Sequence, residues 1–431
     1  MEYRYTRGYK ILLSNHLAHG VRRITYNMQK KLRKGLSIEE KTLLKLLRNA
    51  ISDKAGKYQV KESCDWEAVL ELARAHAVTA VLYDVLAVQE KCPAPLLEQV
   101  KQYSQITVLS NYRLLFLNKY LTEYLGQHNI QAITLKGCVT AALYPVPEYR
   151  KSGDIDLLIP KKEDYQRACR LLQDAGLHCL EKQSSPHHTE LETIEGIVVE
   201  VHGMLAAPFE NNRMNEYLQT LLMSFSENMT ENKSWGVRLY QPSDAYHAFY
   251  LALHMLQHFL REGFGLKNLC DWTVFWNRNI AKGVKQQFLK LVSDSGMGQF
   301  VRVLTAACVR YMGLPKERVA FIFTEPVPKE AVFLFIQEVL DAGEFGRSEK
   351  DRMVVMQGTG AIAFVQEFHH QMHVSYPRAG CIFVCWPVLW VLTLARFLSN
   401  NRRLHRGSAI QIMHKARRRS KLTKQLRLFG K

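Results

Sequence analysis

Two aspartates one residue apart, Asp154 and Asp156, open the apolar stretch DIDLLI. Alternate residues of a β-strand face the same side, so a strand here would point both carboxylates one way and Ile155 and Leu157 into the core. Two carboxylates held this close repel each other, and a divalent cation between them relieves the repulsion. The pattern predicts a Mg²⁺ or Mn²⁺ site that orients a triphosphate for in-line attack. The alternative is a solvated strand end with two surface acids, which a bare Asp-x-Asp spacing fits more often.

A third carboxylate is expected on a neighbouring strand. In the predicted hairpin at residues 188–202, the second arm alternates an apolar face with a face that carries Glu200 and His202. Glu200 interrupts a run of valines and isoleucine, where a solvated acid is hardest to accommodate, so it is expected to face the metal cleft. It would act as a third metal ligand or as the base for an attacking hydroxyl. Glu190 and Glu192 lie on the first arm, which reads as an exposed strand.

Residues that could bind phosphate precede the aspartates. A predicted strand ends at Lys136 and Gly137, and a short helix is expected to follow. A glycine there lets backbone N–H groups approach a phosphate, and a helix N-terminus adds a favourable dipole. Arg150 could hold phosphate with a bidentate fork, and the alternative for it is a surface arginine. Gly153, directly before the first aspartate, completes the candidate nucleotide-binding set.

Histidines form a second group of candidates. His247, His254 and His258 fall near one face of a predicted helix. Two histidines four residues apart could ligate a metal, but no HExxH motif is present. We therefore favour hydrogen-bonded imidazoles that line a cleft between domains. His187 and His188, beside the hairpin, are weaker metal candidates.

Taken as a set, the motifs LKG, YP, RxxGDIDLL and VEVH resemble the uncharacterised bacterial nucleotidyltransferase family of the DNA polymerase beta-like superfamily. The similarity extends to DWE in the helical lead-in and to the later LxxHxxxH and CDW segments, where the histidines and Asp271 would have a substrate-side or supporting role. The resemblance implies an α+β fold, in which a small mixed β-sheet nucleotidyltransferase core is flanked by N-terminal and C-terminal helical regions. It implies that Asp154, Asp156 and Glu200 are the catalytic metal ligands and that Gly137 is the phosphate-loop glycine.

One position departs from the superfamily pattern. The phosphate-loop glycine is usually followed by serine, whereas Cys138 follows Gly137 here. Lys136 is expected to replace the missing serine contact as a point charge.

The implied activity is Mg²⁺-dependent transfer of a nucleoside monophosphate from a nucleoside triphosphate, such as ATP, to a hydroxyl on a small molecule, sugar, peptide or protein. Two alternatives remain open. One is a catalytically weak, triphosphate-binding partner protein docked at a membrane. The other is an enzyme that transfers the γ-phosphoryl group with the same metals.

The chain of 431 residues is long enough for several domains. Pattern changes along the sequence predict a basic N-terminal segment (1–35), a helical lead-in (36–125) and a nucleotidyltransferase-like core (126–241). A helical domain (242–345), a linker (346–379) and an apolar segment with a basic tail (380–431) are predicted to follow. Nine cysteines without a CxxC pair suit reduced thiols in a cytoplasm, and no secretory signal is apparent.

The positive charge is concentrated at the end of the chain. Residues 396–431 hold twelve Lys or Arg and no acid, which leaves a net charge of +6 for residues 1–395 out of +18. Nucleic acid is therefore an unlikely partner. An apolar segment followed by a polybasic tail instead suits peripheral docking on an anionic membrane, here the inner face of the cell membrane. The alternative is a buried helix with a solvated tail.

Overall fold

The computed structural model describes most of the chain between residues 35 and 343 and a few positions beyond it, namely residues 35–52, 58–180, 187–209, 211–232, 236–261, 263–343, 369, 372 and 386–392. Its centre is a five-stranded mixed sheet in the order β1-β2-β5-β4-β3. The strands are β1 (Ile133–Thr134), β2 (Asp154–Leu158), β3 (His178–Cys179), β4 (His188–Glu192) and β5 (Val198–His202). β2 and β5 run parallel, whereas the other pairs in this sheet are antiparallel.

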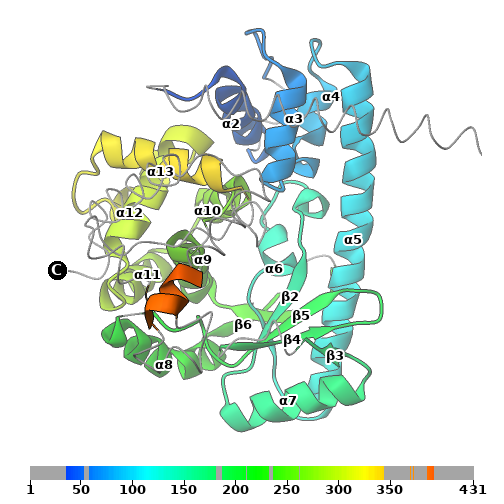
Figure 1. Cartoon of the computed structure of the whole chain (residues 1–431), viewed down its shortest axis with the longest axis vertical. Coiled ribbons are helices and arrows are strands. Elements are labelled where there is room, and N and C mark those ends of the chain that lie inside the picture. The colour runs from blue at the N-terminus through cyan, green and yellow to red at the C-terminus, as the bar shows by residue number, and fades with distance from the viewer. Residues whose placement is uncertain are drawn as a thin grey trace, which may run out of the picture.

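Helices precede the sheet in the sequence. They are α2 (Ile38–Ala50), α3 (Trp66–Ala75), α4 (Tyr83–Ala87) and the 34-residue α5 (Ala94–Gln127). The first of them begins with a reciprocal capping box, because Glu40 N donates to Ser37 Oγ at 3.1 Å and Ser37 N donates to Glu40 Oε2 at 2.8 Å. α5 runs from these helices down one side of the molecule to the sheet (Figure 1).

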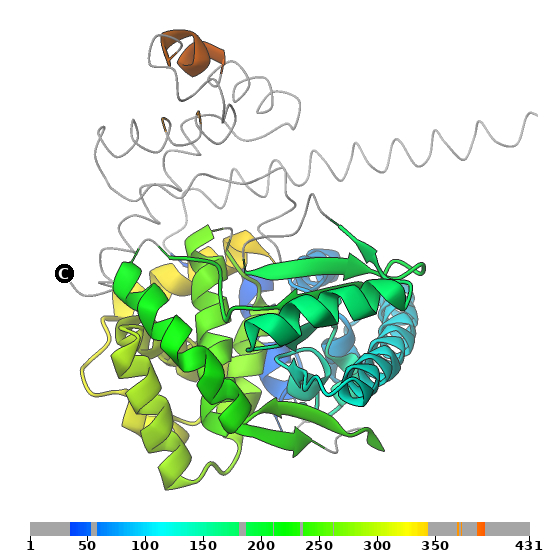
Figure 2. The same cartoon turned by 90° about the horizontal axis from the view of Figure 1, so that it is seen from below.

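One face of the sheet is apolar and is covered by two helices. Ile155, Leu157, Val199 and Val201 point to this face and pack with buried leucines of α5 and with α7 (Lys162–Asp174). Figure 2 shows α7 and α5 lying against the strands. Since strand residues alternate between faces, the acids between these apolar residues must point to the opposite face.

The C-terminal half is mainly helical. After α8 (Asn212–Glu227), a separate hairpin of β6 (Met229–Asn232) and β7 (Leu239–Pro242) leads into a group of helices. These are α9 (Asp244–Arg261), α10 (Leu266–Asn277), α11 (Lys282–Asp294), α12 (Gly298–Ala307) and α13 (Lys329–Ala342). One cluster of buried apolar side chains runs from α2 through α9 to α13 and includes Leu158 of the sheet. Shorter turns are η1 (Ala80–Leu82), α6 (Cys138–Ala141) and η2 (Pro147–Tyr149) near the sheet, and η4 (Cys308–Met312), η5 (Lys316–Arg318) and η6 (Ala320–Ile322) near α12.

The α+β architecture predicted from the sequence is confirmed, with a small mixed sheet and flanking helices. The predicted hairpin is present as the antiparallel pair β4 and β5. The strand expected over residues 130–135 is shorter, because only two residues of β1 pair with β2.

The described residues include little of the two ends of the chain. The basic segment 1–34, most of the linker and the basic tail lie outside the described residues. Within the apolar segment, residues 386–392 form a short helix. Val388 and Val391 of this helix are exposed. Among the described helices, none combines the length and hydropathy needed to cross a bilayer. Membrane docking stays a prediction.

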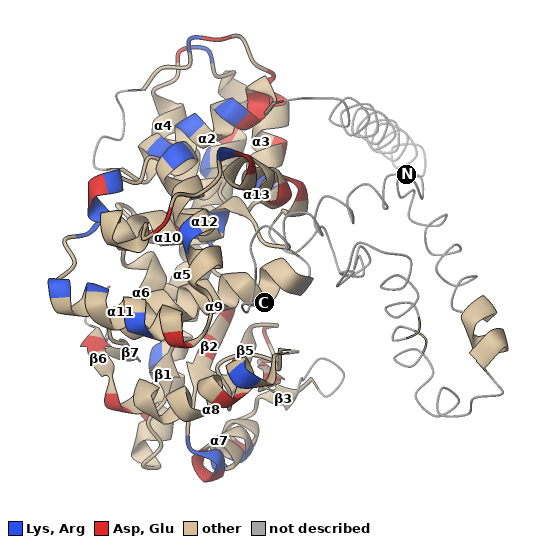
Figure 3. Ribbon diagram, turned by 90° about the vertical axis from the view of Figure 1, so that its left-hand side faces the viewer, with Lys and Arg blue, Asp and Glu red and all other residues tan. Residues whose placement is uncertain are grey.

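Charged residues do not gather into one patch in the view that Figure 3 presents. Lys and Arg alternate there with Asp and Glu along the described helices. This distribution agrees with the mild net charge of the chain before its tail.

The packing of α5 on the sheet gives a first testable prediction. Leu121 is fully buried among the sheet side chains, whereas Leu109 on the same helix is 65% exposed. Leu121→Ala should lower the free energy of unfolding by about 2–5 kcal/mol because it leaves a cavity. Leu109→Ala, the control with the same change in helix propensity, should lower it by less than about 0.5 kcal/mol. Urea unfolding followed by circular dichroism measures both, and equal losses would contradict this packing.

Candidate metal and nucleotide site

Three carboxylates lie on the polar face of the sheet. The parallel register of β2 and β5 places Asp156 directly opposite Glu200, and Asp154 lies on the same face of β2 as Asp156. The side chain of Asp156 is completely buried, whereas those of Asp154 and Glu200 are 31% and 21% exposed. The three acids predicted from the sequence are therefore together at one site.

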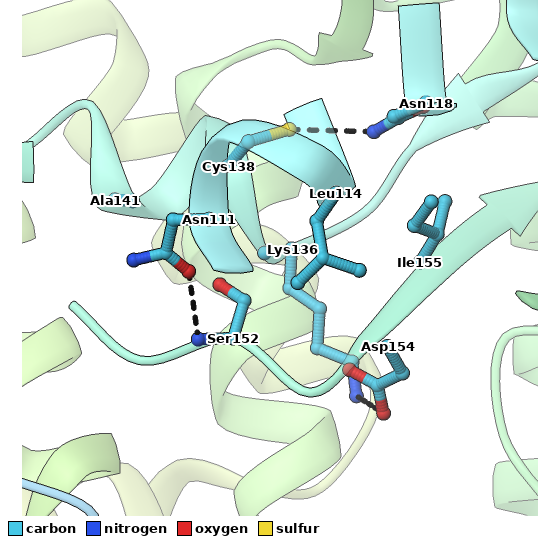
Figure 4. Close-up of a pocket in the computed structure, with 10 residues that line it drawn as sticks. Asn111, Leu114, Asn118, Lys136, Cys138, Ala141, Ser152, Asp154 and Ile155 are labelled. Carbon is cyan, nitrogen blue, oxygen red and sulfur yellow. Dashed lines mark hydrogen bonds and ion pairs between the residues drawn. The ribbon is translucent and has the colours of Figure 1, made fainter. Parts of the chain in front are cut away.

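Lys136 balances part of this negative charge. Its Nζ lies 3.1 Å from Asp156 Oδ1. The same nitrogen lies 3.9 Å from Asp154 Oδ2, and Figure 4 shows this pair of side chains. Burial alone would lower the pKa of Lys136, but Asp154, Asp156 and Glu200 outweigh it and hold that pKa well above its usual value. The ammonium thus sits between the two aspartates, where the sequence predicts a divalent cation.

His202 supplies a second positive charge. Its Nε2 lies 3.2 Å from Asp156 Oδ1 and 3.2 Å from Glu200 Oε2. Burial disfavours the imidazolium, yet the hydrogen bonds to these two acids raise the pKa of His202 to about 9. For Glu200, burial opposes ionisation, but His202 and Lys136 together lower its pKa to about 2. At this site, two cations therefore face three carboxylates.

The residues present fit a divalent cation. Asp156, Glu200 and His202 each offer a ligand atom, and these atoms lie within 4.8 Å of one another. Asp156 Oδ2 is buried and has no hydrogen-bond partner among the described residues. A buried carboxylate oxygen without a partner is costly, and a bound cation would remove that cost. Oxygen ligands of this kind are those that Mg²⁺ and Mn²⁺ prefer.

A pocket adjoins Asp154 at the turn between β1 and α6. It is lined by residues of α5, of this turn and of the segment before β2: Asn111, Leu114, Asn118, Lys136, Gly137, Cys138, Ala141, Ser152, Asp154 and Ile155 (Figure 4). Gly137 has φ +67°, a conformation that favours glycine over residues with a Cβ. The space beside Gly153 is open, since an added Cβ would meet nothing within 4 Å. The predicted phosphate-binding glycines thus lie at or beside this pocket.

Cys138, which follows Gly137, carries a thiol with a hydrogen-bond partner. Asn118 Nδ2 donates to Cys138 Sγ at 3.3 Å, and burial raises the pKa of this thiol to about 11. The thiol is therefore neutral and would not repel a phosphate. A serine hydroxyl still lines the pocket, because Ser152 is held there by a hydrogen bond from its backbone N to Asn111 Oδ1 at 3.2 Å.

Arg150 is buried and not on the surface, so the alternative of a surface arginine is wrong. Its Nε and Nη2 donate to the two oxygens of Asp271 at 2.7 and 2.8 Å. Its Nη1 donates to Gly137 O at 3.3 Å and to Ser152 Oγ at 3.1 Å. The guanidinium is thus engaged within the protein, and it holds both Gly137 O and Ser152 Oγ by hydrogen bonds.

The histidines of α9 have protein partners. His254 Nε2 accepts a hydrogen bond from Lys136 Nζ at 3.0 Å. His258 Nε2 lies 3.1 Å from His254 Nε2. His247 Nε2 lies 3.1 Å from Thr140 Oγ1 of α6. Burial lowers the pKa of His247 to about 4 and, with Lys136 and His258, holds the pKa of His254 well below its usual value. These contacts support the interpretation of the α9 histidines as hydrogen-bonded imidazoles between α9 and the sheet.

The predicted exposure of Glu190 is wrong. The sequence predicted an exposed position, but its side chain is only 16% exposed and its Oε1 lies 3.1 Å from His188 Nε2. The reason is the hairpin register, which pairs Glu190 with Glu200 and so gives both the same face. Glu195, in the turn, is exposed as its position suggests.

Sequence reasoning gave Asp271 a supporting role without identifying its partner Arg150, and it missed Asn111. Asp271 is 121 positions from Arg150, and the only signal was its place in the CDW segment. Asn111 on α5 anchors the segment before β2, since its Nδ2 donates to Glu148 O at 2.7 Å and Arg150 O at 2.9 Å. Within a long helix, a single buried asparagine carried no distinctive pattern.

Comparison with known proteins places these features in a family. The sequence model of the family described as "uncharacterised nucleotidyltransferase" matches residues 62–313, more than half of the chain. No curated protein matches the sequence significantly. The solved structure of an antigenic nucleotidyltransferase-like protein from Paracoccidioides brasiliensis shares 15% identity, with 47% of this chain and 92% of that chain covered. Its TM-score is 0.28, and a similarity this weak gives no information on activity.

The buried ion pair gives a second prediction. Arg150 and Asp271 are each at most 5% exposed in their side chains, so Asp271→Asn should leave a buried arginine without its counter-charge. The free energy of unfolding should fall by on the order of 3–5 kcal/mol. Asp244→Asn is the matched control, because its partner Arg278 is about a third exposed and such pairs contribute about 0–1 kcal/mol. Chemical denaturation measures both losses, and a small loss at Asp271 would show that the pair does not hold this site together.

Proposed function

Because the chain belongs to a family of uncharacterised nucleotidyltransferases, we propose that it transfers a nucleoside monophosphate from a nucleoside triphosphate to a hydroxyl acceptor, with release of pyrophosphate and with the help of Mg²⁺ or Mn²⁺. The observation that carries the proposal is the convergence of three carboxylates on one buried sheet face, with Asp156 opposite Glu200 in the strand register. The pocket beside Asp154 is the proposed place of the triphosphate.

Asp154, Asp156 and Glu200 would hold the metal. When bound, a divalent cation neutralises charge on the phosphates and helps align the attacking and leaving oxygens. Glu200 is proposed as a ligand and not as the general base. A carboxylate with a pKa of about 2 is a weak proton acceptor near neutral pH, whereas ligation needs the ionised form.

Lys136 is proposed to change partners during binding. In the structure its ammonium lies between the two aspartates and also donates to His254. The ammonium of Lys136 would leave Asp154 and Asp156 when they ligate a metal, because like charges repel, and a phosphate in the adjoining pocket would offer it a new anionic partner. Lys136 would then bind the triphosphate at the position where serine is usual in the superfamily.

Arg150 and Ser152 are proposed to position the pocket. Arg150 holds Gly137 O and Ser152 Oγ while it is itself fixed by Asp271. With its donors engaged in this way, the guanidinium keeps the turn and the serine in place for phosphate binding. Direct binding of phosphate by Arg150 would first require loss of the buried pair.

Transfer of label distinguishes the proposal from its alternatives. The protein is incubated with Mg²⁺, a cell extract as the source of acceptors, and triphosphates labelled at the α or the γ phosphate. Label from the α position should enter the acceptor. Label from the γ position alone would identify a phosphoryl transferase, and no transfer with retained triphosphate binding would identify a binding protein.

The metal ligands provide the first prediction for this activity. Asp154→Asn should reduce transfer of α label by on the order of 100-fold or more, because one charge is removed from the metal site. Asp174→Asn, at an exposed position on α7, is the control and should be unaffected. Circular dichroism verifies that both variants fold. Full activity of Asp154→Asn would mean that this site does not hold the catalytic metal.

The lysine provides a second prediction. Lys136→Met removes the cation that occupies the space between the aspartates, so Mn²⁺ should bind more tightly in the absence of triphosphate. The same variant should raise KM for the triphosphate, since a phosphate contact is lost. Electron paramagnetic resonance of free Mn²⁺ and steady-state kinetics measure the two effects. Lys162→Met, an exposed lysine, is the control. Weaker Mn²⁺ binding in Lys136→Met would show that the lysine supports the metal and does not compete with it.

A further inference from the structure

A group of three buried histidines lies beside the carboxylates, and the metal ligands proposed above, Asp154, Asp156 and Glu200, do not include them. His187, His188 and His202 are at most 8% exposed, and the hairpin register places His188 directly opposite His202. Their ring centroids lie 4.1, 5.2 and 6.0 Å apart. One ligand atom from each of the three residues lies within 4.8 Å of the others.

Carboxylates hold the outward nitrogens of two of these rings. His188 Nε2 lies 3.1 Å from Glu190 Oε1, and His202 Nε2 lies 3.2 Å from both Asp156 Oδ1 and Glu200 Oε2. In metal-binding histidines, the ring nitrogen that does not bind the metal almost always donates to such a partner, which fixes the tautomer and the ring orientation. These contacts involve Nε2 of both rings, so Nδ1 is the second nitrogen that each ring can offer to a metal.

The other nitrogens of this group fall into two kinds, a pair that lie close together and one that has no hydrogen bond to the described residues. His188 Nδ1 lies 2.8 Å from His187 Nε2. His202 Nδ1 is buried and makes no hydrogen bond with any of the described residues. A buried ring nitrogen that is left unsatisfied costs free energy, and ligation of a metal would remove that cost.

We propose that His187 Nε2, His188 Nδ1 and His202 Nδ1 bind a transition-metal ion of the zinc class, in a site separate from the oxygen-rich site of the aspartates. Imidazole nitrogens suit Zn²⁺, Co²⁺ and Ni²⁺, whereas Mg²⁺ prefers carboxylate and water oxygens. Three histidines leave one coordination position open for water in a tetrahedral site. The chain would therefore bind Mg²⁺ or Mn²⁺ at the aspartates and a metal of the zinc class at the adjacent histidines.

The role that follows is positioning. A metal on His202 Nδ1 fixes the ring whose Nε2 contacts both Asp156 and Glu200. It would also join β4 to β5, since His188 and His202 lie on different strands of the hairpin. The nitrogen site would thus hold the two acids of the oxygen site in place without contacting substrate.

Co²⁺ is the probe, because its visible absorption reports tetrahedral coordination. The full chain, stripped with a chelator, is titrated with Co²⁺ in a large excess of Mg²⁺. We expect one equivalent to bind with a tetrahedral spectrum, without the intense near-ultraviolet band that a cysteine ligand would add. Zn²⁺ should displace the Co²⁺ and raise the Tm of the stripped protein.

Variants assign the ion to the histidines. The double variant His187→Ala/His188→Ala should lose the spectrum and the Tm shift, whereas His178→Ala, an exposed histidine on β3, should keep both. Glu190→Gln, which keeps all three proposed ligands, should weaken Co²⁺ binding by about 10–100-fold. This milder variant tests the proposal even if the double variant does not fold.

Asp154→Asn separates this inference from the proposed function. That variant is expected to lose nucleotidyl transfer, but it should retain the Co²⁺ spectrum, because Asp154 is paired with Lys136 and is not one of the acids that contact the three histidines. Unchanged Co²⁺ binding in both the double variant and Glu190→Gln would overturn the inference. Loss of the spectrum in Asp154→Asn would place the ion at the aspartates and would overturn it as well. Absence of a tetrahedral spectrum in the intact protein would leave only a hydrogen-bonded histidine cluster.

Discussion

The parallel pairing of β2 with β5 is the constraint on which the rest of the site depends. It sets Asp156 opposite Glu200 and so places like charges side by side on a buried sheet face. Like charges in that position repel, and desolvation increases the cost. The fold has to supply compensating charge close by. Lys136 and His202 do so within hydrogen-bond distance of the acids.

The surrounding helices follow from the same constraint. The apolar side of β2 and β5 is closed by α5 and α7, which leaves the polar side to face α9. α9 carries histidines where it lies against this side. Burial lowers the pKa of His254, so its imidazole is neutral, accepts a hydrogen bond from Lys136 and adds no further positive charge. An amphoteric ring is well suited to a surface that holds a lysine on one side and an apolar core on the other.

Local patterns in the sequence were sufficient for β2 and for the hairpin of β4 and β5, and for the direction of the side chains on β2 and β5. Period-two alternation identified the shared face of Asp154 and Asp156, and the run of valines around Glu200 marked the third acid. Facts that depend on register or on distant partners were not accessible. The inward direction of Glu190 follows from the pairing across the hairpin, and the partner of Arg150 lies 121 residues away. Periodicity reports which way a side chain points within its own strand, but it does not report which segment will lie next to it.

The pair of Arg150 and Asp271 has a consequence for how this chain can be divided and inherited. Arg150 belongs to the segment before β2, whereas Asp271 lies on α10 in the helical half. Expressed apart, each half would carry a charge that its own interior cannot neutralise, so the two halves are expected to fold poorly as separate pieces. In related proteins, substitution at one position should be accompanied by substitution at the other. The sheet and the helices behind it would then be exchanged between proteins only as one unit.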